Sequence, residues 1–287
     1  MWLFFALASA FFAGLVAILA KVGIRSTPAN LATALRTVVV LGMAWAVVFI
    51  VGSQASLTTI SGKSFAFLVL SGLTTGASWL CFFKALQIGD VTRVAVVDRS
   101  SIVLTVLLGM VLFGEVTHLW TQLLGVAAFT IGTLVMIQRQ SQSVESSSDY
   151  KWLVYAAGGA IFATATTLLV KVGISDVDSS LGTAIRTVVV LVMAWIVVLV
   201  SGEHRRLSVI PRRDLIFLAL SGLATGASWL CFYRALQIGP ISAVVPIDKL
   251  SIVVTVIFAA LVFGERLTRR GLIGLILIIA GTVLLAV

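Results

Sequence analysis

The chain has 287 residues, of which 60% are hydrophobic and 11% are charged, and its formal net charge is +9 at pH 7. This composition excludes an ordinary soluble domain. Nucleic-acid binding is not indicated either, because the basic residues form no run with interleaved aromatic residues outside the apolar segments. We therefore predict an all-α polytopic membrane protein.

Ten apolar segments are long enough to cross a bilayer, since a transmembrane helix needs about 20 apolar residues. Together they use nearly the whole chain. In chain order, we expect spans at roughly 2–22, 31–52, 64–86, 92–114, 119–138, 152–172, 181–201, 214–236, 242–264 and 269–287.

The second half of the chain repeats the first at an offset of 150 residues. Between 71–89 and 221–239, 16 of 19 residues are identical, and between 31–48 and 181–198, 14 of 18 are identical. We predict two five-helix units, 1–137 and 151–287, joined by a flexible polar linker at 138–151. Because five is an odd number, the second unit enters the membrane from the opposite face. Such inverted repeats are typical of alternating-access transporters.

The basic residues outside the four repeat pairs Lys21/Lys171, Arg36/Arg186, Lys84/Arg234 and Arg99/Lys249 predict the orientation in the membrane. There are twelve of them; eleven fall on one side of the ten-span topology, and only Lys63 falls on the other. By the positive-inside rule, the side with eleven is cytoplasmic. The linker is then cytoplasmic and both termini are outside. We expect a multi-pass protein of the plasma membrane, which in a bacterium is the inner membrane.

The remaining charges occur as repeat pairs inside the spans and predict one charged layer on each side of the midplane. Each layer has four cations and one carboxylate. Charges at such depths face a cavity or a partner, although long Lys and Arg side chains also snorkel to the interface. The layer of the first unit contains Lys21, Arg36, Lys84, Asp98 and Arg99, and that of the second contains Lys171, Arg186, Arg234, Asp248 and Lys249.

These charges divide into candidate substrate contacts and candidate gating groups. Arg36 and Arg186 lie about five residues into their spans, so we expect them to line a cavity. Asp98 and Asp248, with the cations around them, form a candidate gating or proton-coupling site; the alternative is a structural ion pair. Pro246 removes a backbone donor just before Asp248 and can break the helix there. The gating set is Lys84, Asp98, Arg99, Arg234, Asp248 and Lys249.

Near the midplane the side chains are small or hydroxylic, with one Trp in each unit. Trp79 and Ser101 have the repeat mates Trp229 and Ser251. Tryptophan at this depth lies away from its usual interfacial position. With Arg36 and Arg186, these four residues are the predicted substrate-binding set, although plain helix packing explains the tryptophans almost as well.

Several short motifs have a structural interpretation. The GxxxG patterns at 72–76 and 222–226 predict close helix crossings. Gly-Glu pairs at 114–115 and 264–265 predict helix ends with solvated carboxylates. Cys81 and Cys231 are repeat mates without a surrounding ligand cluster, so we expect no metal site and no cofactor. The sequence contains no G-x-S-x-G, H-E-x-x-H or P-loop motif, and we do not expect an enzyme.

The whole chain resembles the EamA family of the drug/metabolite transporter superfamily. The resemblance rests on the paired five-span units, on Phe-Gly-Glu at 113–115 and 263–265, on the early Arg of the second span in each unit, and on the spaced glycines Gly125/Gly132 and Gly274/Gly281. It implies secondary transport, usually export, of amino acids or other small metabolites through a central cavity. Two features depart from the family pattern. The repeat identity is unusually high, as in a recent fusion of a single-unit protein or an engineered sequence. In addition, ten-span members usually have cytoplasmic termini.

We therefore expect a secondary transporter that exports small zwitterionic or anionic metabolites by alternating access. Its partners would be the substrate, the lipid bilayer and protons as the candidate coupling ion. It would act as a monomer, which is an internal pseudo-dimer, or as a homodimer. The alternatives are a passive channel or facilitator for small solutes and a non-transporting membrane scaffold.

Overall fold

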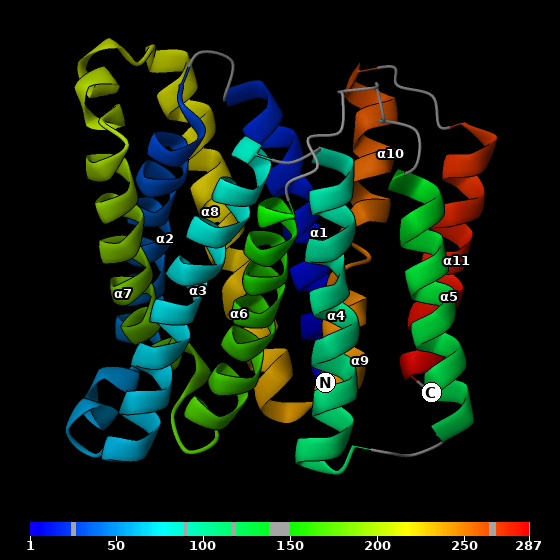
Figure 1. Cartoon of the computed structure of the whole chain (residues 1–287). Coiled ribbons are helices and arrows are strands. Elements are labelled where there is room, and N and C mark those ends of the chain that lie inside the picture. The colour runs from blue at the N-terminus through cyan, green and yellow to red at the C-terminus, as the bar shows by residue number, and fades with distance from the viewer. Residues whose placement is uncertain (24–26, 89–90, 116–118, 138–149, 264–267, 287) are drawn as a thin grey trace.

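A computed structural model describes the chain except for residues 24–26, 89–90, 116–118, 138–149, 264–267 and 287. Only the backbone is described at residues 20–23, 83, 87, 91–93, 95–96, 137, 259–260 and 262–263. The predicted linker lies almost entirely outside the described residues. In the described part of the chain, the secondary structure is helical and contains no strand (Figure 1).

The helices follow the predicted spans to within a few residues. The first half contains α1 (Trp2–Gly23), α2 (Ala29–Val51), the 3-10 helix η1 (Ser53–Thr58), α3 (Gly62–Ile88), α4 (Val91–Phe113) and α5 (Leu119–Ile137). The second half contains α6 (Lys151–Gly173), α7 (Ser179–Val200), the 3-10 helix η2 (Glu203–Val209), α8 (Arg212–Ile238), α9 (Ile241–Asp248), α10 (Ser251–Phe263) and α11 (Arg269–Ala286).

The ninth predicted span is two helices rather than one. Helix α9 ends at Asp248 and α10 begins at Ser251. Pro246 has no N–H with which to continue the α-helical ladder. The chain instead tightens into i→i+3 bonds, in which the Lys249 N–H donates to Pro246 O at 3.1 Å and the Leu250 N–H donates to Ile247 O at 2.9 Å. The equivalent helix α4, which has Val96 in place of the proline, continues without a break.

Nine stretches of the described residues are long and apolar enough to cross a membrane, with α9 and the first part of α10 counted as one. Helix α4, which carries Asp98 and Arg99, is not among them. The chain is thus a multi-pass, all-helical membrane protein, whereas the count of ten spans stays a prediction.

The two ends of the helix bundle differ in charge. Both termini lie at the lower end in Figure 1, which we call the termini end, whereas α5 ends and α6 begins at the upper end, which we call the linker end. Cations outside the four repeat pairs of the spans begin α6, α8 and α11 and lie in η2, all at the linker end: Lys151, Arg205, Arg206, Arg212, Arg213, Arg269 and Arg270. Lys63 lies at the start of α3, at the termini end.

Helices of one half pack on helices of the other. Helix α1 packs on α8, and their repeat mates α6 and α3 pack on each other in the same way. The repeat mates α2 and α7 pack on each other, as do α5 and α11. Helices α1 and α6 run in opposite directions (Figure 1).

Glycines permit the close crossings that the GxxxG spacing predicts. A Cβ on Gly72 of α3 would lie 2.6 Å from Val189 Cβ of α7, and a Cβ on Gly222 of α8 would lie 2.7 Å from Val39 Cβ of α2. The backbones of α3 and α8 are thereby fixed against the helices that carry Arg186 and Arg36, respectively.

Candidate functional site

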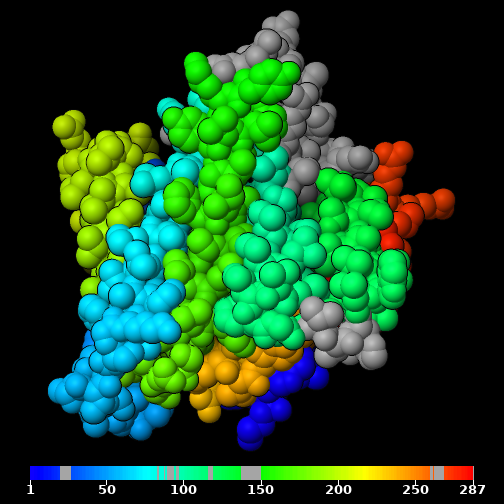
Figure 2. All heavy atoms as spheres, turned by 60° about the horizontal axis from the view of Figure 1, so that its bottom comes forward, coloured from blue at the N-terminus to red at the C-terminus, as the bar shows by residue number. Residues whose placement is uncertain are grey.

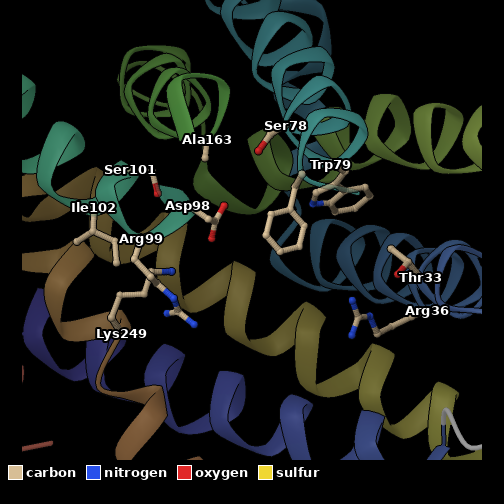
Figure 3. Close-up of a pocket in the computed structure, with 11 residues that line it drawn as sticks. Thr33, Arg36, Ser78, Trp79, Asp98, Arg99, Ser101, Ile102, Ala163 and Lys249 are labelled. Atoms are coloured by element: carbon tan, nitrogen blue, oxygen red, sulfur yellow. The ribbon is translucent and has the colours of Figure 1, made fainter. Parts of the chain in front are cut away.

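A polar cavity of about 400 Å³ lies between the helices of both halves. Figure 3 shows side chains from α2, α3 and α4, together with Lys249 from the break between α9 and α10, around this common space. Thr33 and Arg36 lie in the first third of α2, which begins at the linker end. The cavity therefore extends toward that end. Its lining residues are Thr33, Arg36, Ser78, Trp79, Phe82, Asp98, Arg99, Ser101, Ile102, Ala163 and Lys249.

Three cations and one carboxylate line this cavity. The cations are Arg36, Arg99 and Lys249, and the carboxylate is Asp98. Among the described residues, neither Arg36 nor Asp98 forms a hydrogen bond or an ion pair within 4.0 Å. Arg36 and Asp98 are therefore available to a solute, and the charges of the four lining groups sum to a positive value.

Aromatic and hydroxyl groups form the rest of the wall. Trp79 lies on the α3 side of the cavity (Figure 3), and Phe82 of the same helix also lines it. Ser78 lines the same side and donates a hydrogen bond to the Gly159 carbonyl of α6 at 2.9 Å, which ties α3 to α6. Ser101 contributes a hydroxyl from α4, and its carbonyl accepts a hydrogen bond from Thr164 at 3.0 Å. The wall thus offers flat apolar surface beside polar groups.

The equivalent arginine of the second half is in a different state. Arg186 is 1% exposed. Its Nε donates to Ser71 Oγ at 3.3 Å, its Nη2 donates to Thr75 Oγ1 at 2.8 Å, and its Nη1 donates to the Tyr233 hydroxyl. The guanidinium carbon also lies 5.3 Å from the ring centroid of Trp229 and 4.8 Å from that of Tyr233, within cation–π range. Arg186 is therefore occluded and held by three hydrogen bonds, whereas Arg36 lines an open cavity.

Asp248 also has hydrogen-bond and ion-pair partners, which its repeat mate Asp98 lacks among the described residues. Asp248 is 9% exposed. Its Oδ1 accepts a hydrogen bond from Ser9 Oγ at 2.6 Å, and its Oδ2 lies 3.2 Å from Lys249 Nζ. Ser9 occupies the position equivalent to Gly159, which has no side chain to offer Asp98. Asp248 is thus fixed by a partner that has no equivalent for Asp98.

A third cluster closes the termini end. The Glu115 carboxylate accepts hydrogen bonds from the N–H groups of Ile241 and Ser242, both at 2.9 Å, and so caps the start of α9. Lys171 Nζ lies 3.8 Å from Glu115 Oε1 and donates to the Leu236 carbonyl at 2.7 Å. Atoms of α9 lie between α4 and the start of α1 in Figure 2, where the termini end comes forward.

This cluster corrects the expectation of a solvated carboxylate at Glu115. The Glu115 side chain is 14% exposed, because it lies against the N-terminus of α9, whose first N–H groups need an acceptor. Glu265, its repeat mate, lies outside the described residues.

The structure brings half of the twelve predicted site residues together in the cavity. Six line the cavity: Arg36, Trp79, Asp98, Arg99, Ser101 and Lys249. Lys249 was expected in the layer of the second half, but the helix break places it beside the residues of the first. Arg186, Trp229 and Asp248 belong to the group of residues around the buried Arg186 and Asp248, which we call the occluded cluster. Ser251 begins α10. Lys84 is exposed on α3, and Arg234 donates to Gln237 Oε1 at 2.6 Å.

Sequence reasoning missed Ser9 and Tyr233 as members of the occluded cluster. Both differ from their repeat mates, Gly159 and Phe83. Positions at which two nearly identical units differ were therefore the signal that could have found them.

Comparisons with known proteins agree with this architecture. Residues 1–138 and 150–287 each match the EamA-like transporter family. A protein from Sinorhizobium sp., named "Uncharacterized transporter in cobO 3'region", is 46% identical over 136 residues, which are 47% of this chain and 96% of that protein. One half of this chain thus corresponds to that whole protein. A solved crystal structure superposes with a TM-score of 0.76 over 99% of this chain and 95% of the other, at 13% sequence identity, and so shares the fold.

Proposed function

We propose that this chain, which belongs to the EamA-like transporter family, is a secondary transporter that exports a small zwitterionic or anionic metabolite by alternating access. The family and the transporter that is 46% identical support transport across a membrane. The nature of the solute, the mechanism and the coupling are the proposal.

The observation that carries the mechanism is the difference between two equivalent arginines. Arg36 lines an open cavity, while Arg186 is buried and hydrogen-bonded. In an alternating-access cycle built from two inverted units, one charged layer is closed while the other is open. A passive pore would need both layers open at once, and the engaged termini end argues against it.

The charge of the cavity favours a solute with a carboxylate or a similar anionic group. Arg36 can bind such a group through two parallel N–H donors. Asp98 can accept a hydrogen bond from the ammonium group of a zwitterion. Trp79 and Phe82 can pack on the apolar part of the same solute. The three cations outnumber the single carboxylate, so a purely cationic solute would be repelled.

The distribution of charge supports an orientation and a candidate coupling residue. The excess at the linker end of cations outside the four repeat pairs supports a cytoplasmic position for that end. The cavity would then load from the cytoplasm. Asp98 has no ion-pair partner among the described residues and is the candidate proton acceptor, since opening and closing around a carboxylate change its proton affinity.

Reconstitution into liposomes tests this function. Purified protein would first be screened for thermal stabilisation by amino acids and small carboxylates, because a bound ligand stabilises the folded state. Counterflow and concentrative transport of the best ligand would then be compared for wild type, Arg36→Ala and the control Lys63→Ala at the protein surface. We expect only Arg36→Ala to lose transport. Transport that never becomes concentrative under any imposed ion gradient would instead indicate a channel, and no transport of any ligand that stabilises the protein would indicate a scaffold.

A further inference from the structure

Polar residues bind Arg186, and their repeat mates bind no arginine among the described residues. Ser71 and Thr75, both on α3, receive Arg186 from α7, and Tyr233 completes the set. The offset of 150 residues maps Arg186 onto Arg36, Ser71 onto Ser221 and Thr75 onto Thr225. Each set spans the two halves, since the arginine comes from one and the hydroxyls come from the other.

Thr225, in the set that binds no arginine, is already arranged like Thr75, in the set that binds Arg186. Thr225 Oγ1 donates to the Ser221 carbonyl at 2.7 Å, just as Thr75 Oγ1 donates to the Ser71 carbonyl at 2.8 Å. This bond leaves the Thr225 oxygen free to accept a second hydrogen bond, as Thr75 does from Arg186. No rotation of the threonine is therefore needed for it to bind an arginine.

Ser221 is buried without a partner. It is 0% exposed, and its Oγ has no hydrogen-bond partner among the described residues. A buried hydroxyl without a partner costs free energy, so such groups are uncommon in native structures. The equivalent oxygen, Ser71 Oγ, accepts a hydrogen bond from Arg186 and donates one to the Leu68 carbonyl at 2.6 Å.

The backbone of Arg36 already lies beside this site. A Cβ on Gly222 would be 2.9 Å from Arg36 O, and a Cβ on Gly72 would be 3.0 Å from Arg186 O. The crossing of α2 with α8 therefore has the same geometry as the crossing of α7 with α3. The two arginines differ in the conformation of their side chains. Arg36 could therefore reach Ser221 by side-chain rotation without a change in this helix contact.

We infer that Ser221 and Thr225 are positioning residues that bind the Arg36 guanidinium when the linker end closes. This inference rests on the proposed alternating access. In the state described here, Arg36 faces the cavity and Arg186 is held. In the opposite state, Arg36 would leave the cavity and bind Ser221 and Thr225, while Arg186 would be released to line a cavity at the termini end.

The two sets of residues are not equal in strength. Tyr233 gives Arg186 a third hydroxyl, whereas the equivalent position holds Phe83, which has none. Arg186 thus gains one charge-assisted hydrogen bond that its mate cannot make, and a bond of this kind changes an equilibrium by about tenfold or more. The state that is open at the linker end should therefore be the resting state.

A pair of equivalent reporters can test this inference. Thr33 lines the cavity and its repeat mate Thr183 is 0% exposed. Thr33→Cys and Thr183→Cys would be made separately in a chain in which Cys81 and Cys231 are replaced by alanine. The rates of labelling by a water-soluble maleimide would then report opening at the linker end and at the termini end, respectively.

Matched variants should shift these rates in opposite directions. Ser221→Ala should slow labelling at position 183 by about tenfold, because it removes a partner of Arg36 in the state that exposes this position. Ser71→Ala should speed labelling at position 183 by a similar factor, and Tyr233→Phe should do the same. Thr225→Val should act like Ser221→Ala and replaces that variant if it fails to fold, as judged by its thermal unfolding. Equal rates in Ser221→Ala and wild type, or a shift of the same sign in Ser221→Ala and Ser71→Ala, would overturn the inference.

The labelling needs no substrate, so its outcome is separate from that of the proposed function. Opposite shifts without any transport in liposomes would leave the binding of Arg36 by Ser221 in place and refute the transport proposal. Normal transport with unchanged labelling rates would refute the inference alone.

Discussion

Glu115 should control how often the termini end opens, and Glu115→Gln tests this. The carboxylate accepts two backbone hydrogen bonds of 2.9 Å from the start of α9. Glutamine keeps one acceptor oxygen but places an amide N–H₂ against the second donor. A hydrogen bond to a charged group contributes about 1.5–3 kcal/mol, and the loss of a helix cap costs about 0.5–2 kcal/mol. Water replaces part of this when the end opens, so we expect a loss of about 1.5 kcal/mol.

This loss corresponds to a roughly tenfold rise in the open population. The assay is maleimide labelling of Thr183→Cys, whose rate should rise by about that factor. Replacement of Lys171 should also raise the labelling rate of Thr183→Cys, but by a smaller factor. Its ammonium lies 3.8 Å from the Glu115 carboxylate and also donates hydrogen bonds to main-chain carbonyls.

Glu203→Gln is the matched control for this prediction. Glu203 accepts hydrogen bonds from Asn30 Nδ2 at 2.7 Å and from the Leu31 N–H at 3.0 Å, so it also caps a helix across the two halves. It lies at the linker end, in a contact that is already made while that end is open. We expect a comparable fall in thermal stability with labelling within about twofold of wild type. If both variants changed labelling equally, Glu115 would be a general stabiliser and the reasoning above would be wrong.

Three further predictions concern topology, the arginines and the carboxylates. A cysteine at Glu145 should be labelled only from the cytoplasm and both termini only from outside; cytoplasmic labelling of the termini would reverse the orientation. Arg36→Ala and Arg186→Ala should both abolish transport in liposomes, but Arg186→Ala should be the less stable protein in thermal unfolding, because it leaves three buried hydroxyls without their donor. Asp98→Asn and Asp248→Asn should abolish proton-driven accumulation while substrate binding stays measurable by thermal shift, and wild-type accumulation in both would leave the pair a structural role only.

Much of the fold could be predicted from sequence because each span carries its own signal. Long apolar segments set the helix boundaries, and the glycine spacing predicted close crossings at 72–76 and 222–226, for which the structure supplies the partner helices α7 and α2. The gathering of Arg36, Asp98 and Ser101 in one cavity was also predictable, since charges deep in a span need a polar surrounding.

Which charged layer is occluded could not be predicted, because the repeat makes the two layers almost equal in sequence. Arg36 and Arg186 have nearly the same neighbours along the chain, and only tertiary packing separates them. The cap at Glu115 was hidden for a related reason. Its partner, the N-terminus of α9, lies 126 residues away in the sequence at Ile241.

Three sequence differences between the halves all favour occlusion of the termini end. Ser9 in place of glycine gives Asp248 a hydrogen bond at 2.6 Å, and Tyr233 in place of phenylalanine gives one to Arg186. Pro246 in place of valine breaks the ninth span, so that Lys249 can pair with Asp248 and still line the cavity.

No equivalent gain is visible around Arg36 and Asp98 in the described part of the chain, so these two residues remain available to a solute. Two nearly identical units in an inverted arrangement would have no preferred direction, because exchanging them would exchange the two open states. We expect each of the three differences to lower the free energy of the state that is open at the linker end. If that end is cytoplasmic, as the eleven-to-one distribution of the cations outside the four repeat pairs predicts, we expect the protein to rest with its binding groups facing the cytoplasm. A carrier with this resting state loads from inside the cell, which is the direction that export requires.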